Sequence, residues 1–532
     1  MQHSAYFDKR LPIMAQLSSS PEPSSEKISS MNAISTEDDP DENHLMEMLK
    51  SLECPFNWLQ EYEKKKISRI QEKLEEMEDE ELFPWRKFNL RLILSYEYCR
   101  EKSYSESLET LQFCEKIITS KDHKGIYENL YQDTKDALCY IIKSCKCHLY
   151  FAKKCLNEVK QILPGICKYE EMNNKCKAAI WGVRAIVMME YGPEATKSSY
   201  DFVRKAKELD PRQQEWLFLE VKCLGRIRRF ENYHEISEKE LNAMNELNKN
   251  IEKTKNPGYL IFLAQAYREI SFAMRIQGRY HRDRELRRQV HDMNQRSVSL
   301  YRQALRLRPD CGHINYRCAE AFFKFTQPFK DVKLAKECRD KALQLAPSNI
   351  MANHIGARIY ELLDRDIENA KKYYKKAAEL GGYGAHLELY KLYYQEDNTY
   401  DPIPELEKLL ERFQNKTLQE KTLCQMGSYY CFIKNDLPTA YKYWRQVMDD
   451  NPDSKRLKNH KCSFIPSMKT PINIYELLFD EARITIRRPE RKLDEDTLAI
   501  LNEIISTISE RFPQLANNPP VPRRRMAMEE WQ

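Results

Sequence analysis

Small and bulky residues recur along this chain at spacings that predict a series of amphipathic helices. In five segments a small residue or valine is followed, five positions later, by proline or glycine: Ala206–Pro211, Ala304–Pro309, Ala342–Pro347, Ala377–Gly382 and Val447–Pro452. Seven positions before each segment lies another small residue, and three positions before it lies a residue that is usually bulkier. These spacings place the side chains on one helix face, and proline ends the helix because it cannot continue the hydrogen-bond ladder.

The distance between successive segments indicates the architecture. The step is 38 residues from Ala304 to Ala342, 35 from Ala342 to Ala377 and 70, or two times 35, from Ala377 to Val447. A period of about 34 residues with this ending is typical of the tetratricopeptide helix pair. One pair cannot bury its apolar face alone, so several pairs must stack. The sequence therefore predicts an all-α fold, a tetratricopeptide-repeat helical superhelix, or α-solenoid.

Composition divides the chain into six parts. Residues 1–42 are rich in Ser, Pro, Asp and Glu and poor in large apolar residues, so we expect them to be disordered. Helix pairs are expected in the N-terminal repeats, 43–229, and in the central and C-terminal repeats, 258–460. Between them, 230–257 is expected to be a linker with an amphipathic helix. Residues 461–516 are expected to form C-terminal helices, and 517–532 a disordered tail.

Location and cofactors follow from what the chain contains. There is no run of about 18 apolar residues and no signal-peptide apolar region, so we expect a cytoplasmic protein without a membrane segment. Sixteen cysteines are scattered through helical patterns, which favours reduced thiols. Cys145 and the pair Cys147-His148 resemble part of a metal site, but no second ligand pair has zinc-finger spacing. We therefore expect neither a metal nor another cofactor.

The motifs of common enzyme classes do not occur. The sequence has no Gly-rich phosphate loop of the Walker type, no G-x-S-x-G and no H-E-x-x-H. Its eleven histidines are dispersed, and a net charge of +5 does not by itself indicate nucleic acid. A helical solenoid without these motifs is expected to be a binding scaffold and not an enzyme.

The distribution of arginine is more informative than the net charge. From Arg268 to Arg308 there are eleven arginines and four acidic residues, a local charge of +7, and a second group comprises Arg226, Arg228 and Arg229. Arginine binds phosphates, often with two parallel hydrogen bonds. A single arginine of this kind usually lies on a solvated helix face, but the arginines of this cluster outnumber the acidic residues near them in the sequence.

Aromatic residues lie among these charges. Bases of single strands stack on aromatic rings while cations bind the phosphates, which requires no sequence code. Tyrosine and phenylalanine at helical spacing nevertheless belong most often to the core. The aromatic residues in question are Trp181, Trp216, Phe262, Tyr267, Phe272, Tyr280, Tyr316, Phe322 and Phe323.

Four stretches, between residues 45 and 460, resemble the family of interferon-induced proteins with tetratricopeptide repeats. They are LKSLECPFNW at 49–58, NLRLILSYEYCREKSYSESLETLQFCEKI at 89–117, KCKAAIWGVRA at 175–185 and YRQALRLRPDCGHINY at 301–316. The resemblance implies a superhelix with a positively charged central pocket. It further implies that the pocket holds the 5′ end of single-stranded RNA, triphosphate or cap, in antiviral innate immunity.

The resemblance also implies roles for particular residues. The family's basic residue after the opening tryptophan falls on Lys66 or Arg69, and its arginine 15 residues after a helix-ending proline falls on Arg226. Its cap-stacking tryptophan matches Trp181 by motif, whereas the register of the helix-ending proline places Ile186 there. An arginine of a later repeat falls near His354, and a His-Gln pair falls near 386–388. With the arginine clusters, the predicted RNA-binding set is Lys66, Arg69, Trp181, Arg184, Arg226, Arg228, Arg268, Arg275 and His354.

Two functions are therefore expected from different classes. The first is single-stranded RNA binding, probing the RNA 5′ end in a basic central channel, with other tetratricopeptide proteins as further partners and without DNA or membrane binding. The second is a protein-interaction scaffold that binds a peptide or partner helix in its concave groove. Arginines inside the concave surface would favour RNA, whereas arginines on the convex rim paired with acids would favour the scaffold.

Overall fold

The computed structural model describes residues 40–62, 66–75, 84–119, 128–276, 282–464, 471–487 and 493–523. Residues 1–39 and 524–532 hold most of the two segments expected to be disordered, and they lie outside the described residues, as do Arg279 and Tyr280. Among the described residues, 40–48 belong to one unit and those from Leu49 onward to another. All helices from Pro55 onward belong to the second unit.

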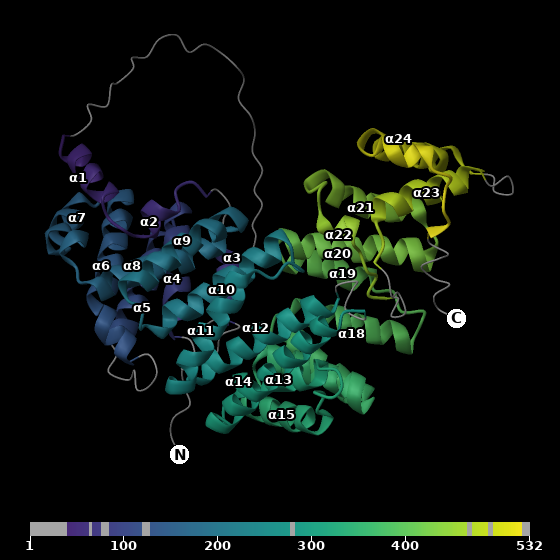
Figure 1. Ribbon diagram of the computed structural model, residues 1–532. Coiled ribbons are helices and arrows are strands. Elements are labelled where there is room, and N and C mark those ends of the chain that lie inside the picture. The colour runs from purple at the N-terminus through teal and green to yellow at the C-terminus, as the bar shows by residue number, and fades with distance from the viewer. Residues whose placement is uncertain are drawn as a thin grey trace, which may run out of the picture. The chain divides into compact units, whose positions relative to one another are not determined.

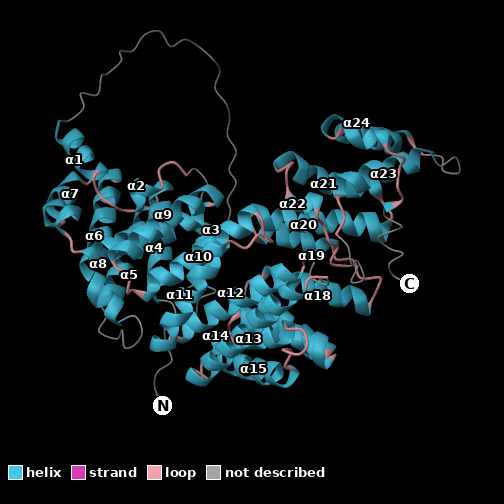
Figure 2. Ribbon diagram, in the orientation of Figure 1, coloured by secondary structure: helices cyan, strands magenta, loops and turns pink. Residues whose placement is uncertain are grey.

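Helices make up the fold, as Figure 2 shows, and the described ranges contain 24 α-helices and no β-strand. The first twelve are α1 Pro40–Lys50, α2 Pro55–Trp58, α3 Ile67–Glu75, α4 Pro84–Arg100, α5 Tyr104–Thr119, α6 Glu128–Ala152, α7 Leu156–Ile162, α8 Asn174–Met188, α9 Pro193–Leu209, α10 Gln214–Glu231, α11 Glu238–Thr254 and α12 Pro257–Arg275. The rest are α13 Arg284–Leu307, α14 Gly312–Lys324, α15 Val332–Leu345, α16 Ile350–Ile359, α17 Ile367–Glu379, α18 Tyr383–Glu396, α19 Ile403–Arg412, α20 Lys416–Ser428, α21 Leu437–Asp450, α22 Lys455–Lys458, α23 Ile474–Arg487 and α24 Glu495–Arg511.

Consecutive helices pack as pairs, and the pairs follow one another along the chain (Figure 1). The pairs in contact are α4–α5, α6–α7, α8–α9, α10–α11, α12–α13, α14–α15, α16–α17, α20–α21 and α23–α24. Helix α18 packs mainly on α17, and α19 packs on α20. The all-α repeat architecture that the 34-residue period predicts is therefore confirmed. Between α4 and α21, the even-numbered members of these pairs are called first helices and the odd-numbered members second helices.

The small residues of the five repeated segments form the contact between helices. Ala206, Ala304, Ala342, Ala377 and Val447 are at most 2% exposed. The small residues seven positions earlier, and the bulkier ones three positions earlier, are buried too: Ser199, Ser297, Ala335, Ala370, Ala440, Val203, Tyr301, Arg339, Tyr374 and Trp444. The predicted packing face of the second helices is thus confirmed.

The proline or glycine of each repeated segment determines where its helix ends. The carbonyl of Ala304 accepts the backbone N–H of Arg308 at 3.0 Å, after which Pro309 ends the helix. In the segment without proline, Gly381 adopts φ +103° and the N–H of Gly382 donates to the Ala377 carbonyl at 2.8 Å. Glycine is needed there because this left-handed conformation strains residues with a Cβ.

The stretch expected to be a linker contains the second member of a helix pair. Helix α11 packs on α10 and also contacts α12. Met244, Leu247 and Ile251 on α11 are at most 1% exposed. The amphipathic pattern of 230–257 therefore arises because its apolar face belongs to the repeat core.

Candidate nucleic-acid interface

A row of side chains on α10 forms one wall of a cavity of about 220 Å³. Glu215, Phe218, Lys222, Arg226 and Arg229 are spaced by three or four residues, so they share a helix face. Leu219 of α10 and residues from α4, α8, α12 and α14 complete the lining: Trp85, Arg86, Ile186, Ile261, Phe262, Gln265, His313 and Arg317.

A second cavity, of about 590 Å³, continues from the first. The two cavities share Gln265 and Arg317, and we call them together the basic groove. The remaining lining of the second cavity comes from α12, α13, α14 and nearby loops: Tyr233, Arg268, Glu269, Ser271, Phe272, Arg275, Asn294, Glu320, Lys324, Phe325 and Thr326.

Positive charge dominates the groove. Its lining includes eight arginines or lysines and three glutamates. All eight cations are on first helices: Arg86 on α4; Lys222, Arg226 and Arg229 on α10; Arg268 and Arg275 on α12; Arg317 and Lys324 on α14. The repeat geometry therefore brings cations from four separate pairs to one surface, and such a cleft concentrates anions.

Several of these cations are not neutralised. Lys222 and Arg268 have no ion-pair or hydrogen-bond partner among the described residues. Burial, with the charges of Arg226 and Arg86, holds the pKa of Lys222 well below its usual value. Arg317 Nη1 is 3.7 Å from a carboxylate oxygen of Glu320, but its Nε is buried without a hydrogen-bond partner in the described ranges. An anion would satisfy groups that the protein leaves unsatisfied.

One carboxyl lies in the wall of the first cavity. Glu215 is 3% exposed, accepts a hydrogen bond from the Tyr259 hydroxyl and has no ion-pair partner among the described residues. Burial raises the pKa of Glu215 from 4.5 to about 7, although Tyr259 and Lys222 partly oppose this.

This pKa predicts how stability depends on pH. Between pH 4.5 and 7 the folded protein keeps a proton on Glu215 that the unfolded chain has released, so this residue's contribution to stability falls as pH rises. As pH rises from 4.5 to 7, the free energy of unfolding of the Glu215→Gln variant should increase by up to about 3 kcal/mol relative to that of wild type. Chemical denaturation of both proteins at pH 5 and pH 7.5 measures the difference. An unchanged difference at the two pH values would contradict a raised pKa.

Three predicted RNA-binding residues meet in the groove. Arg226 lines the first cavity, where Nη1 donates to the Met189 carbonyl at 2.7 Å and Nη2 is 3.1 Å from Glu190. Arg268 and Arg275 line the second, and Arg275 lies 3.4 Å from the Thr326 hydroxyl. The structure thus brings together residues that the sequence placed in two separate clusters.

Arg228 takes a different position from its neighbour Arg226. It is 6% exposed, and its guanidinium lies 3.0 Å from Glu240 and 2.9 Å from Glu269 and donates to the Tyr233 carbonyl. Its partners are the protein's own carboxylates because position 228 faces α11 and α12. We therefore leave Arg228 out of the proposed interface.

Trp181 also lies away from the groove. Its ring stacks on Phe202 with centroids 5.5 Å apart, and Lys205 lies 4.4 Å from its centre. Arg184 belongs to the same cluster, since it packs over Phe202 and pairs with Glu53 at 3.2 Å. Ile186, which the proline register selected, lines the first cavity instead. Position 181 faces α9 and not α10, so the expected stacking of a terminal base on Trp181 stays a prediction for a surface apart from the groove.

The last three predicted residues lie outside the lining of both cavities. Lys66 lies 6.0 Å from the ring of Tyr191, and Arg69 is exposed on α3. His354 lies on α16, the first helix of the pair that follows α14–α15. Its ring meets that of Tyr374 edge-on, with centroids 5.5 Å apart. Burial and Arg358 lower the pKa of His354 to about 4, so the ring is neutral at physiological pH.

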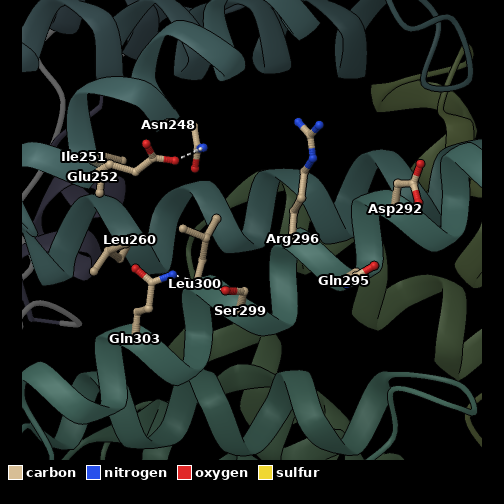
Figure 3. A pocket seen from close by; sticks show the side chains of 10 residues that line it. All are labelled: Asn248, Ile251, Glu252, Leu260, Asp292, Gln295, Arg296, Ser299, Leu300 and Gln303. Carbon is tan, nitrogen blue, oxygen red and sulfur yellow. Dashed lines mark hydrogen bonds between the residues drawn. The ribbon is translucent and has the colours of Figure 1, made fainter.

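The arginine-rich stretch 268–308 divides between two surfaces. Its members on α13 are exposed on a second helix, away from the groove. There Arg296 borders a separate cavity of about 390 Å³ between α11 and α13, where Glu252 and Asp292 outnumber it (Figure 3). Arg296 donates to Asn245 at 2.9 Å. This separate cavity is therefore not suited to an anion.

Sequence reasoning missed half of the groove's cations. Arg86, Lys222, Arg317 and Lys324 lie in short stretches that are not rich in arginine. Their common signal is spacing: cations recur every three or four residues on first helices, as at 222 and 226. Counting the charged residues on each helix face separately would have selected these four cations.

Comparison with known proteins supports the fold. The chain is similar to a human IFIT1 dimer with PPP-AAAA, at TM-score 0.50 and 15% identity, over 89% of this chain and 100% of that chain. It is also similar to a monomeric IFIT1 mutant with Gppp-AAAA, at TM-score 0.51 and 14% identity, over 89% and 99%. No protein-family model and no curated protein sequence matches the chain. At this identity the likeness shows a shared tetratricopeptide solenoid fold.

Two further findings concern membranes and metals. In the part of the chain that the structure describes, no helix is both long and apolar enough to cross a bilayer. Within the same ranges, no three His, Cys, Asp or Glu side chains are placed to hold a metal ion.

Proposed function

We propose that this protein binds single-stranded RNA in the basic groove. The observation that carries the proposal is the convergence of eight cations from four first helices on two connected cavities, with only three carboxylates. The solved IFIT1 structures of similar fold contain PPP-AAAA or m7Gppp-AAAA, which supports RNA as the anion.

The groove combines the two kinds of contact that single strands need. Lys222, Arg226 and Arg268 offer N–H donors to phosphates, and Phe218, Phe262 and Phe272 offer aromatic surface to bases. Phe218 and Phe262 already pack edge-to-face with centroids 4.5 Å apart, so this surface is preformed. None of these contacts reads base identity, and the proposed binding is therefore independent of sequence.

The 5′ end is the part of the strand that we assign to the first cavity. Its volume of about 220 Å³ suits a terminal phosphate group rather than a longer segment, and a phosphate beside the Lys222 amine would favour the charged form of that amine. The proposal gives the protein a non-enzymatic, cytoplasmic role in recognising RNA ends, with an antiviral function. The protein-scaffold alternative would gain from the exposed arginines of α13, but those of the groove favour RNA.

A binding titration tests the proposal. A short single-stranded RNA with a 5′-triphosphate should bind more tightly than the same RNA with a 5′-hydroxyl. For about three phosphate contacts, affinity should fall about tenfold to twentyfold between 50 and 200 mM salt. Affinity that is the same at both salt concentrations would exclude a groove that works through phosphates. A double-stranded RNA of equal length is the control, and it should bind more weakly because its bases are already paired.

A further inference from the structure

A proline-rich segment, residues 519–523, is fastened to α23 at both of its ends. Its sequence is PPVPR, and it follows the short helix Pro513–Asn517. Just before the segment, the Asn518 carbonyl accepts a hydrogen bond from Arg483 Nη1 at 2.8 Å. At its other end, the Arg523 side chain contacts α23 as well. We call residues 519–523 the proline segment.

The arginine of the proline segment binds two carboxylates. Arg523 Nη1 is 2.8 Å from a carboxylate oxygen of Glu476, and Nε is 2.7 Å from one of Asp480. Glu476, Asp480 and Arg483 are spaced by four and three residues, so they share one face of α23. Hydrogen bonds between charged groups are stronger than neutral ones, and the segment therefore lies along this face with its arginine turned to acids.

The backbone of the proline segment is suited to an extended helix of the polyproline type. A residue before proline is restricted to extended conformations, and Asn518, Pro519 and Val521 each precede a proline. Asn518 has φ −96° and ψ 145°. Three residues make one turn of such a helix, so Pro519 and Pro522, which are both exposed, would lie on the same side.

The segment departs from this conformation at one place. The Arg523 backbone N–H donates to the Val521 carbonyl at 2.7 Å, which closes a tight turn at Pro522. The turn brings Arg523 to the α23 carboxylates. A partner that binds the extended form must therefore open this turn and replace those carboxylates.

We propose that the proline segment, with the arginine that follows it, is the ligand of a protein domain of the SH3 class. Such a domain binds polyproline helices in an aromatic-lined groove, where Pro519 and Pro522 would fill two neighbouring pockets. Arg524 is two positions after Pro522 in the sequence and lies outside the described residues. The order P-x-x-P-x-R places a cation beside the prolines, and the complementary groove has carboxylates at its end.

Binding would exchange one set of carboxylates for another. The side chains of Arg523 and Glu476 are 36% and 32% exposed, so theirs is a surface ion pair that water already screens. Breaking such a pair should lower the affinity for the partner by no more than about fivefold. The contact with α23 thus weakens binding of the domain without preventing it.

The test is a competition assay with the full chain. The probes are purified SH3 domains, each chosen because it binds a fluorescent reference peptide of the P-x-x-P-x-R type. Displacement of this peptide, followed by anisotropy, reports occupation of the groove itself. We expect the full chain to displace the peptide from at least one domain, with an affinity within about tenfold of the peptide's own.

Variants of the two exposed prolines locate the contact. Pro519→Ala together with Pro522→Ala should weaken displacement by at least about tenfold, because the groove loses the side chains that fill it. The matched control is Pro513→Ala, an exposed proline outside the segment, which should leave displacement unchanged. Both variants should keep the midpoint of thermal unfolding. They should also keep the affinity for RNA, since the segment lies outside the lining of the basic groove.

The carboxylate exchange has its own variant. Glu476→Gln removes one partner of Arg523 and should raise the affinity for the domain by about twofold to fivefold. An affinity that is unchanged or lower would overturn the exchange. The proposal as a whole would be overturned if the full chain displaced the peptide from none of the domains, or displaced it equally well after both prolines were replaced.

Thermal unfolding separates docking from a purely structural role. If the prolines serve only to hold the segment on α23, their replacement should lower the unfolding midpoint and leave displacement as in wild type. That pair of results would also count against the proposal.

Discussion

Reversing two groove charges, Lys222→Glu together with Arg268→Glu, is expected to abolish measurable binding of single-stranded RNA. Each side chain lies in the wall of the groove without an ion-pair partner among the described residues, so each is available to a phosphate. Replacing a phosphate contact by a repelling carboxylate should cost at least about tenfold in affinity per site, and about 100-fold for the pair. Fluorescence anisotropy with labelled RNA at constant salt measures the loss.

The chain offers a matched control for this variant. Arg284→Glu together with Arg306→Glu makes the same change in net charge on α13, a second helix whose arginines are exposed away from the groove. This variant should keep its affinity within about threefold, since only long-range attraction changes. Equal losses in the two variants would show that net charge, and not the groove, determines binding.

The second large effect concerns stability. Trp444 is fully buried, and a Cβ on Gly427 of the first helix would come within 2.5 Å of its indole, so the ring fills the contact between α20 and α21. Trp444→Ala should lower the free energy of unfolding by about 3–5 kcal/mol because it leaves a large cavity. Urea denaturation followed by circular dichroism measures the change.

Leu362→Ala is the control for this loss. Leu362 is 51% exposed, and its truncation should change the unfolding free energy by no more than about 0.5 kcal/mol. If Trp444→Ala lowers the free energy of unfolding by less than about 1 kcal/mol, the segment from Ala440 to Val447 does not form the core contact that the repeat pattern predicts.

The sequence predicted the fold because the packing rule is local. Ala304, Tyr301 and Ser297 lie within one helix, and their spacing alone determines that they share the buried face. The same rule could not assign 230–257 to a repeat, since α11 lacks a small residue followed five positions later by proline or glycine. Its apolar residues are recognised as core only when α10 and α12 are in place.

The site was less predictable, because it depends on which helix faces which. Counting charge along residues 268–308 pooled Arg268 with the arginines of α13, although Arg268 lies on the first helix of the pair and the others lie on the second helix, at a different surface. A local motif selected Trp181, whereas the register of the helix-ending proline selected Ile186, which lines the groove. Register along the repeat predicts a side chain's direction, and a short motif does not.

Photocrosslinking decides whether single-stranded RNA binds in the basic groove. A short single-stranded RNA with 4-thiouridine at its first positions is bound to the full chain, irradiated and mapped by mass spectrometry. We expect crosslinks in α10, α12 and α14, within 214–231, 257–275 and 312–324, that excess unlabelled RNA removes. Crosslinks confined to α13, or spread evenly over the chain, would contradict it.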